Sequence, residues 1–135
     1  MHISDAQLQL IIQTLRESAS ARLIFLFGSV CRDTFRPDSD IDIAFLSDRT
    51  LASYEVWLVA QKLADELKRD VDLISLSSAS TVLKAQIVGE GEAIFSASPN
   101  LLAEFSIRVL KDYALLNEER KEILANIRKE GKIYE

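Results

Sequence analysis

The chain has little cysteine and little histidine. Its 135 residues include one cysteine, Cys31, and one histidine, His2. A single cysteine excludes an internal disulfide and any zinc site built from cysteines. Because no histidine lies near Cys31 to activate its thiol, we expect this residue to fill space rather than to act as a nucleophile.

Long apolar runs and an excess of positive charge are absent as well. No run approaches the roughly 20 residues of a membrane span, and the start MHISDAQLQL lacks the basic and then apolar profile of a signal peptide. We therefore expect a cytoplasmic location. The formal net charge of −5 argues against a protein that grips long nucleic acid by its backbone. It leaves room for a small anionic ligand held by local arginines and a divalent cation.

The remaining composition is that of one ordinary globular domain, with 48% hydrophobic and 27% charged residues. Apolar spacing predicts an α/β (α+β) fold: a small mixed sheet with helices over one face, followed by a C-terminal helical extension. Helices are expected from Ser4 with Gln7 as capping partner, over 53–69 and over 80–91 with a stop at Gly89, and strands over 22–27, 41–46, 70–76 and 93–96. We divide the domain into a core, 1–97, and an extension, 98–135. In the extension, Ser98-Pro99 should begin a helix that breaks at Asn117 and resumes over 118–130 before Gly131.

Three aspartates lie on predicted strands or at their edges. In 40-DID-42, side chains two apart point the same way, so Asp40 and Asp42 share one face. Asp72 projects in the same manner from the next strand and completes a three-carboxylate set if the two strands are neighbours. A divalent cation would remove the repulsion among the carboxylates, and oxygen ligands favour Mg²⁺ or Mn²⁺ over zinc. The alternatives are turn chemistry at Asp40 and an ordinary surface carboxylate at Asp72.

A phosphate-binding loop is predicted upstream of these aspartates. Gly28 permits close backbone approach, and the backbone N–H groups with the Ser29 hydroxyl can bind phosphate oxygens. Arg32 and Arg36 lie between this loop and the aspartates and can neutralise a polyphosphate, although Arg36 could equally be a solvated loop charge. Together these residues predict a site for a nucleoside triphosphate.

The spacing Gly28-Ser29, ten residues, Asp40-Ile41-Asp42 resembles the signature of DNA polymerase β-like nucleotidyltransferases. With LFGS, 36-RPDSDID-42, the Asp72 strand, 87-IVGEGEAIF-95 and the tail 129-KEGKIYE-135, nearly the whole chain resembles the minimal nucleotidyltransferase (MNT) antitoxins of type VII HEPN/MNT toxin–antitoxin pairs. Many members read GSRARG where this chain reads 28-GSVCRD-33, so Val30 and Asp33 depart from the pattern.

The resemblance implies a polymerase β-like fold and transfer of AMP from ATP, with two Mg²⁺ ions, to a tyrosine of a cognate HEPN ribonuclease toxin. It makes Asp40, Asp42 and Asp72 metal ligands and catalytic residues, with Asp72 a possible base. Nucleotide contacts are assigned to Gly28, Ser29, Arg32, Arg36 and Ser39.

Two rival functions stay open: an antitoxin that acts only by occlusion, and a nucleotidyltransferase with a small-molecule acceptor, for which the chain is short. A template-directed polymerase is disfavoured by size and acidity. The mixed charges over 118–132 are most simply a solvated helix face. They become a candidate partner surface if the resemblance holds, because a small enzyme that modifies a protein must dock it.

Overall fold

A four-stranded mixed sheet forms the centre of the molecule. The computed structural model describes residues 3–31, 36 and 39–134. The strands are β1 (Ala21–Phe27), β2 (Ile41–Ser47), β3 (Val71–Ser75) and β4 (Glu92–Ser96), in the spatial order β3-β2-β1-β4. β1 pairs antiparallel with both β2 and β4, whereas β2 and β3 run parallel. The expectation of a small mixed sheet is confirmed.

Among the described residues, four α-helices and one short 3-10 helix precede, connect or follow the strands. They are α1 (Asp5–Ala19), the 3-10 helix η1 (Gly28–Cys31), α2 (Ser53–Leu67), α3 (Thr81–Glu90) and α4 (Leu101–Tyr134). Ser4 and Gln7 form the expected capping box at the start of α1. α3 does not stop at Gly89 but ends one residue later, at Glu90. The helical hydrogen-bond pattern continues past Gly89, since the N–H of Gly91 donates to the Ile87 carbonyl at 2.8 Å.

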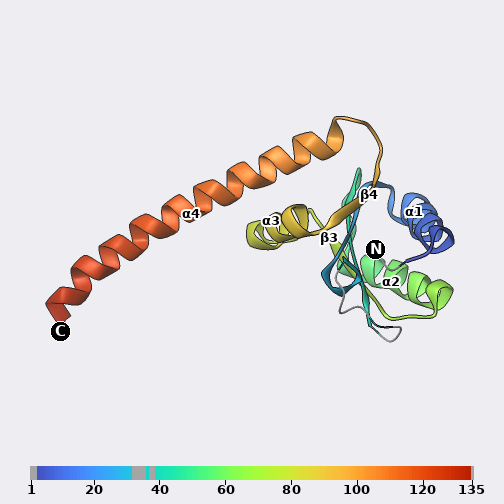
Figure 1. The fold of residues 1–135 in the computed structure, drawn as a ribbon, viewed down its shortest axis with the longest axis horizontal. Helices are drawn as coiled ribbons and strands as arrows, with labels where there is room; N and C mark the ends of the chain where they lie inside the picture. Colours follow the sequence, from blue (N-terminus) through green and yellow to red (C-terminus); the bar gives the residue numbers. More distant parts are fainter. Residues whose placement is uncertain (1–2, 32–35, 37–38, 135) are drawn as a thin grey trace.

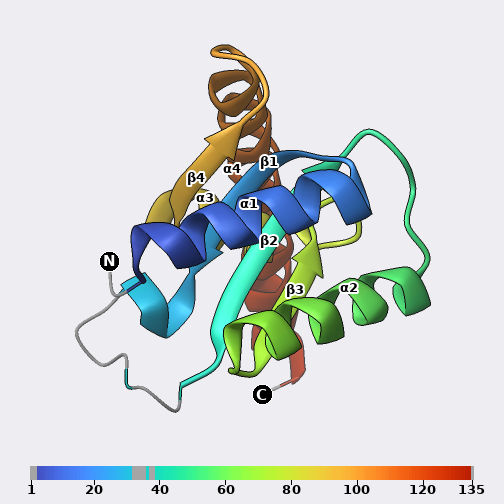
Figure 2. The same cartoon turned by 90° about the vertical axis from the view of Figure 1, so that its right-hand side faces the viewer.

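Helices cover both faces of the sheet, so the expectation of helices on one face is wrong. α1 and α2 lie on one face, and α3 with the first turns of α4 lies on the other (Figures 1 and 2). Alternate residues of β1 enter two separate cores: Ile24 and Leu26 pack under α1 and α2, whereas Leu23 and Phe25 pack with Ile87 of α3. The near-continuous apolar run 23-LIFLF-27 is typical of a strand buried on both faces.

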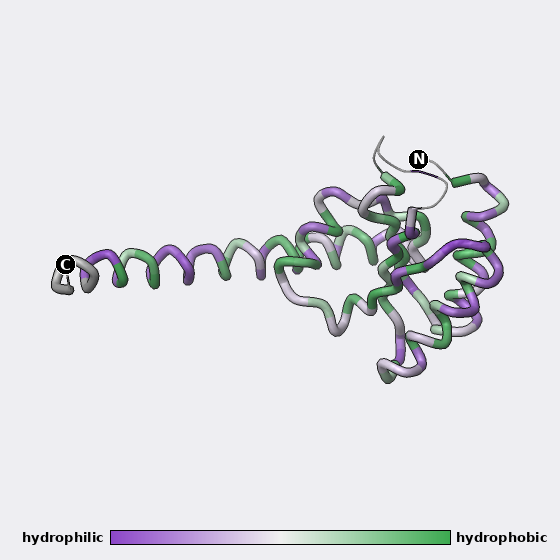
Figure 3. The backbone as a smooth tube through the Cα atoms, turned by 90° about the horizontal axis from the view of Figure 1, so that it is seen from below, coloured by the Kyte–Doolittle hydropathy of each residue, from purple (hydrophilic) through white to green (hydrophobic). Residues whose placement is uncertain are grey.

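The C-terminal extension is a single helix rather than two. α4 begins at Leu101, two residues after the expected Pro99, and continues without interruption through Asn117 and Gly131. Its second half projects away from the rest of the molecule (Figures 1 and 3). Asn117 has a modest cost in a helix interior and is no true breaker. Within the described residues, no helix combines the length and apolarity needed to cross a membrane.

Candidate functional site

Gly28 and Asp42 lie against each other at one end of the sheet. Gly28 directly follows β1, and antiparallel pairing sets Phe27 opposite Asp42 at the start of β2. The backbone of Gly28 has a positive φ of 72°. A Cβ added there would lie 2.2 Å from Oδ2 of Asp42, well inside contact distance. The carboxylate therefore rests on the backbone of the Gly28-Ser29 turn, and only glycine fits this position.

Asp72 is the register partner of Asp42 on the neighbouring strand. β2 and β3 pair in parallel with Asp42 opposite Asp72. The two strands are therefore neighbours, which is the condition for the two aspartates to share a site. Two residues further along these strands, Ala44 and Ile74 belong to the core under α3 and α4. Because alternate side chains share a face, both aspartates point to the α3 and α4 side of the sheet. Asp72 is exposed and Asp42 is half-buried.

Asp40 is exposed and comes one residue before β2. Two residues shortly before Asp40 are joined by hydrogen bonds. Arg36 N–H donates to the Ser39 hydroxyl and Ser39 N–H donates to the Arg36 carbonyl, each at 3.0 Å. The Ser39 hydroxyl therefore already has a structural role, and the Arg36 side chain is exposed.

Of the two departures from the family pattern, Val30 lies in η1, directly after β1. Val30, where a basic residue is common, is fully buried and packs in the core under α1 and α2. A charged side chain at this position would have to leave that core. Cys31 packs against the same core, and its Sγ lies 3.4 Å from the Leu26 carbonyl, as expected for a space-filling residue. Arg32 and Asp33 lie outside the described residues.

The donor chemistry at this end of the sheet suits a hard cation. Asp42 and Asp72 are register partners on neighbouring strands, and carboxylate oxygens are the ligands that Mg²⁺ or Mn²⁺ prefers. Across 3–31, 36 and 39–134, however, no three His, Cys, Asp or Glu side chains are gathered closely enough to hold a metal ion. The backbone register thus brings the acidic positions together without a finished set of ligands. Like charges repel, so carboxylates close fully around an ion only when it compensates them.

Sequence reasoning missed one residue near this site, Arg69. Its guanidinium donates to the carbonyls of Arg36 and Ser39, 33 and 30 residues earlier in the chain. By sequence alone, Arg69 is no more than a charged residue three positions before Asp72. Its position immediately before the strand that carries Asp72 was the one available signal.

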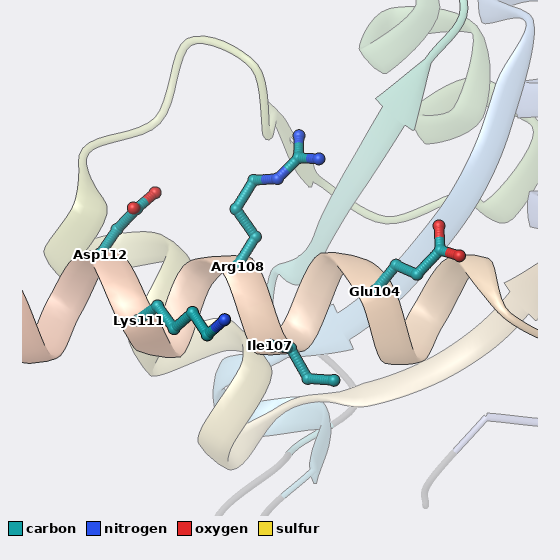
Figure 4. Close-up of a pocket in the computed structure, with 5 residues that line it drawn as sticks. All are labelled: Glu104, Ile107, Arg108, Lys111 and Asp112. Carbon is teal, nitrogen blue, oxygen red and sulfur yellow. The ribbon is translucent and has the colours of Figure 1, made fainter.

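A separate hollow lies along α4, away from the aspartates. It has a volume of about 380 Å³ and is lined by Glu104, Ile107, Arg108, Lys111 and Asp112. Figure 4 shows Glu104, Arg108 and Asp112 on one side of the helix and Ile107 on another. A neighbouring hollow of about 190 Å³ shares some of these residues and reaches Leu46, at the opposite end of β2 from Asp42. Of the predicted phosphate and metal residues that the structure describes, none lines either hollow.

Comparison with known proteins decides the family. The model of the family described as polymerase beta, nucleotidyltransferase matches residues 9–100, which contain Gly28, Asp42 and Asp72. The chain belongs to this nucleotidyltransferase family. The nucleotidyltransferase is also 40% identical over 118 residues to the protein adenylyltransferase MntA of Shewanella oneidensis, covering 87% of this chain and 84% of the relative.

Solved structures agree with this assignment. A toxin–antitoxin structure with AMP-PNP matches with a TM-score of 0.80 at 39% identity, over 89% of the nucleotidyltransferase and 97% of the matched chain. A structure of the tri-AMPylated Shewanella oneidensis HEPN toxin in complex with the MNT antitoxin matches with a TM-score of 0.77 at 36% identity, over 93% and 98% of the two chains. The resemblance inferred from the sequence, including the polymerase β-like fold, is confirmed.

Proposed function

We propose that this nucleotidyltransferase is the antitoxin of a type VII toxin–antitoxin pair and that it adenylylates a tyrosine of its HEPN ribonuclease toxin. ATP is the donor and pyrophosphate the leaving group. The observation that carries the proposal is the convergence of Gly28, Asp42 and Asp72 at one end of the sheet, in a chain similar to a protein adenylyltransferase. We place the reaction in the cytoplasm, where ATP is available.

The proposed chemistry uses the Gly28-Ser29 turn to bind phosphate and Asp72 to accept a proton. The backbone N–H groups of the Gly28-Ser29 turn and the Ser29 hydroxyl bind phosphate oxygens of ATP. The tyrosine oxygen forms a bond to the α-phosphorus while the bond from that phosphorus to the bridging oxygen breaks, which releases pyrophosphate. The exposed carboxylate of Asp72 can accept the tyrosine proton. Most of the rate enhancement comes from positioning and charge neutralisation.

We propose Asp40, Asp42 and Asp72 as the residues that hold Mg²⁺, with two ions expected. When bound, the ions neutralise the charge of the triphosphate and of the departing pyrophosphate. The support is the adjacency of Asp42 and Asp72 and the oxygen-only donor set. We further propose Arg32, Arg36 and Ser39 as nucleotide contacts, and residues 1–97 as the nucleotidyltransferase core with 98–135 as its extension.

α4 offers a surface for a protein acceptor. Phe105 and Val109 on its first turns are turned toward the body, with the Phe105 ring 6.3 Å from that of Phe25 and Val109 4% exposed. Intervals of seven, seven and four residues, which keep to one face of a helix, continue this stripe through Leu116, Ile123 and Ile127. Ile123 and Ile127 are 57% and 55% exposed on the projecting half, where green and purple segments alternate in Figure 3. The stripe faces the side of the sheet to which Asp42 points, so a toxin bound there lies on the catalytic side.

This docking surface can be tested with Ile123→Asp/Ile127→Asp. We expect toxin affinity to fall at least tenfold, because two buried apolar contacts are lost, while the melting temperature of the free protein stays unchanged. Leu110→Asp is the matched control, since Leu110 is 50% exposed on the same helix but lies off the stripe. Unchanged toxin affinity of the double variant refutes the assignment, as does sedimentation evidence that the stripe instead joins two copies of this chain.

The activity itself is tested with α-labelled ATP, Mg²⁺ and the toxin candidate encoded by the adjacent gene. Label should reach the toxin with the wild-type protein and not with Asp40→Asn/Asp42→Asn. The rival function, neutralisation by occlusion, predicts no labelling by either protein and full neutralisation by the double variant. Label on an added aminoglycoside-type acceptor rather than on the toxin would favour the small-molecule alternative.

A further inference from the structure

Arg69 lies where two of the proposed catalytic segments meet. α2 ends at Leu67, and Lys68 adopts the left-handed conformation with a φ of 55°, which reverses the chain. Arg69 N–H still bonds to the Ala64 carbonyl at 3.2 Å. β3 starts two residues after Arg69, and Asp72 is its second residue. The backbone around Arg69 is therefore fixed by the end of a helix on one side and by a strand on the other.

The Arg69 side chain reaches across to the segment that precedes Asp40. Its Nη2 donates to the Arg36 carbonyl and to the Ser39 carbonyl, each at 2.6 Å. The Arg69 side chain is half-buried, and the second of these bonds is partly shielded from water. Hydrogen bonds from a charged donor are short and roughly twice as strong as neutral ones. One guanidinium thus binds the carbonyls of both Arg36 and Ser39.

The main chain next to Arg69 reinforces this connection. Ile41 N–H donates to the Asp70 carbonyl at 2.9 Å, directly before the parallel pairing of Asp42 with Asp72 begins. Asp40 lies between two residues that hydrogen bonds fix. The Ser39 carbonyl accepts a bond from Arg69, and Ile41 N–H donates a bond to the Asp70 carbonyl. Asp40 itself is exposed and has no strand pairing of its own. The direction in which the Asp40 side chain points is therefore set by the hydrogen bonds that fix Ser39 and Ile41.

We propose that Arg69 is a positioning residue that presents Asp40 to the metal and nucleotide beside Asp42 and Asp72. The inference rests on the proposed function, in which Asp40 is a metal ligand. Arg69 does not touch the reacting atoms. Its contribution is to remove the freedom of the segment before Asp40, so that less ordering is needed when the cation and ATP bind.

Calorimetric titration of Mn²⁺ into the protein saturated with AMP-PNP tests this role without requiring catalysis. Arg69→Gln removes the charge and the reach of the side chain, and we expect Mn²⁺ affinity to fall about tenfold or more, the usual loss when a residue that orients metal ligands is removed. Arg69→Lys keeps a single charged nitrogen able to meet both carbonyls, so it should recover part of the affinity. In the transfer assay, excess Mn²⁺ should partly restore the rate of Arg69→Gln.

Arg49→Gln is the matched control. Arg49 also bonds to a distant carbonyl, that of Ser18 at 3.0 Å, and to Glu55 at 2.9 Å, but it lies beyond the opposite end of β2. We expect Arg49→Gln to lower the melting temperature without changing Mn²⁺ affinity. Mn²⁺ affinity of Arg69→Gln within twofold of the wild type overturns the proposal, and so does an equal loss in Arg49→Gln.

The proposed function and the role of Arg69 can be refuted independently of each other. If the wild type labels no toxin while Arg69→Gln still weakens Mn²⁺ binding selectively, the proposed acceptor is wrong and the role of Arg69 stands. If the wild type labels the toxin and Arg69→Gln binds Mn²⁺ normally, the function stands and the role of Arg69 is refuted.

Discussion

Gly28→Ala is the substitution whose consequences the structure defines most sharply. The backbone at Gly28 has a φ of 72°, and an L-residue in this left-handed region costs about 1–2 kcal/mol. The new Cβ would also lie 2.2 Å from Oδ2 of Asp42. Ordinary contact begins near 3.4 Å, so the carboxylate must move by about 1 Å.

The two effects differ in size and can be measured separately. A loss of about 1–2 kcal/mol lowers the melting temperature by roughly 4–8 °C for a chain of this size and leaves the protein folded. A displacement of about 1 Å at a reacting group can cost about 100-fold in rate. We therefore expect a folded Gly28→Ala protein whose rate of AMP transfer from labelled ATP to the toxin falls about 100-fold.

Gly89→Ala is the control, because Gly89 lies in α3 and a Cβ added there meets nothing within 4 Å. Alanine is favoured over glycine in a helix by up to about 1 kcal/mol, so this variant should be equally active and slightly more stable. A Gly28→Ala protein that melts lower yet transfers AMP within twofold of the wild-type rate would show that the contact between Gly28 and Asp42 has no catalytic importance.

Three further predictions concern the site and its supports. Asp72→Asn should lower AMP transfer by about 10²- to 10⁴-fold if Asp72 is the base, while the metal-free protein melts slightly higher because a like charge beside Asp42 is gone; a lower melting temperature would contradict this reasoning. Gly91→Ala should destabilise by about 1–3 kcal/mol in chemical denaturation, since the Cβ would lie 2.5 Å from the Ile87 carbonyl and 2.9 Å from the Leu26 carbonyl; unchanged stability would show that the backbone around Gly91 yields freely. Thr14→Val should cost about 1 kcal/mol by removing the bond from the buried Thr14 hydroxyl to Glu66 at 3.2 Å, with AMP transfer unaffected.

Sequence pattern predicted the structural features that depend on residues close together along the chain. The strands followed from short apolar runs, and the facing of Asp42 and Asp72 followed from the two-residue period of a strand. The pairing of their strands in parallel register had to be assumed, because it depends on how α2 carries the chain back across the sheet. The family motif supplied what periodicity could not, namely the meaning of the spacing between Gly28 and Asp40.

The failures have physical causes that single residues illustrate. Asn117 was expected to end a helix, but its cost of a few tenths of a kcal/mol is small beside the hydrogen bonds on either side. Two-sided burial of β1 was already visible in the unbroken run from Leu23 to Phe27, although the helices were placed on one face only. The contacts of Arg69 span 30 and 33 residues, and no local pattern encodes a hydrogen bond between such distant segments.

The site depends on strand register more than on any one ligand. Antiparallel pairing sets Asp42 beside Gly28, and parallel pairing sets it beside Asp72. A slip of one residue in either pairing would turn an aspartate to the opposite face of the sheet, into the apolar core under α1 and α2. At this end of the sheet, the bond from Ile41 N–H to the Asp70 carbonyl and the two bonds from Arg69 lie where such a slip would begin. A sheet of only four strands can thus hold a partly exposed acidic site in place, because the backbone and one arginine fix the register immediately beside it.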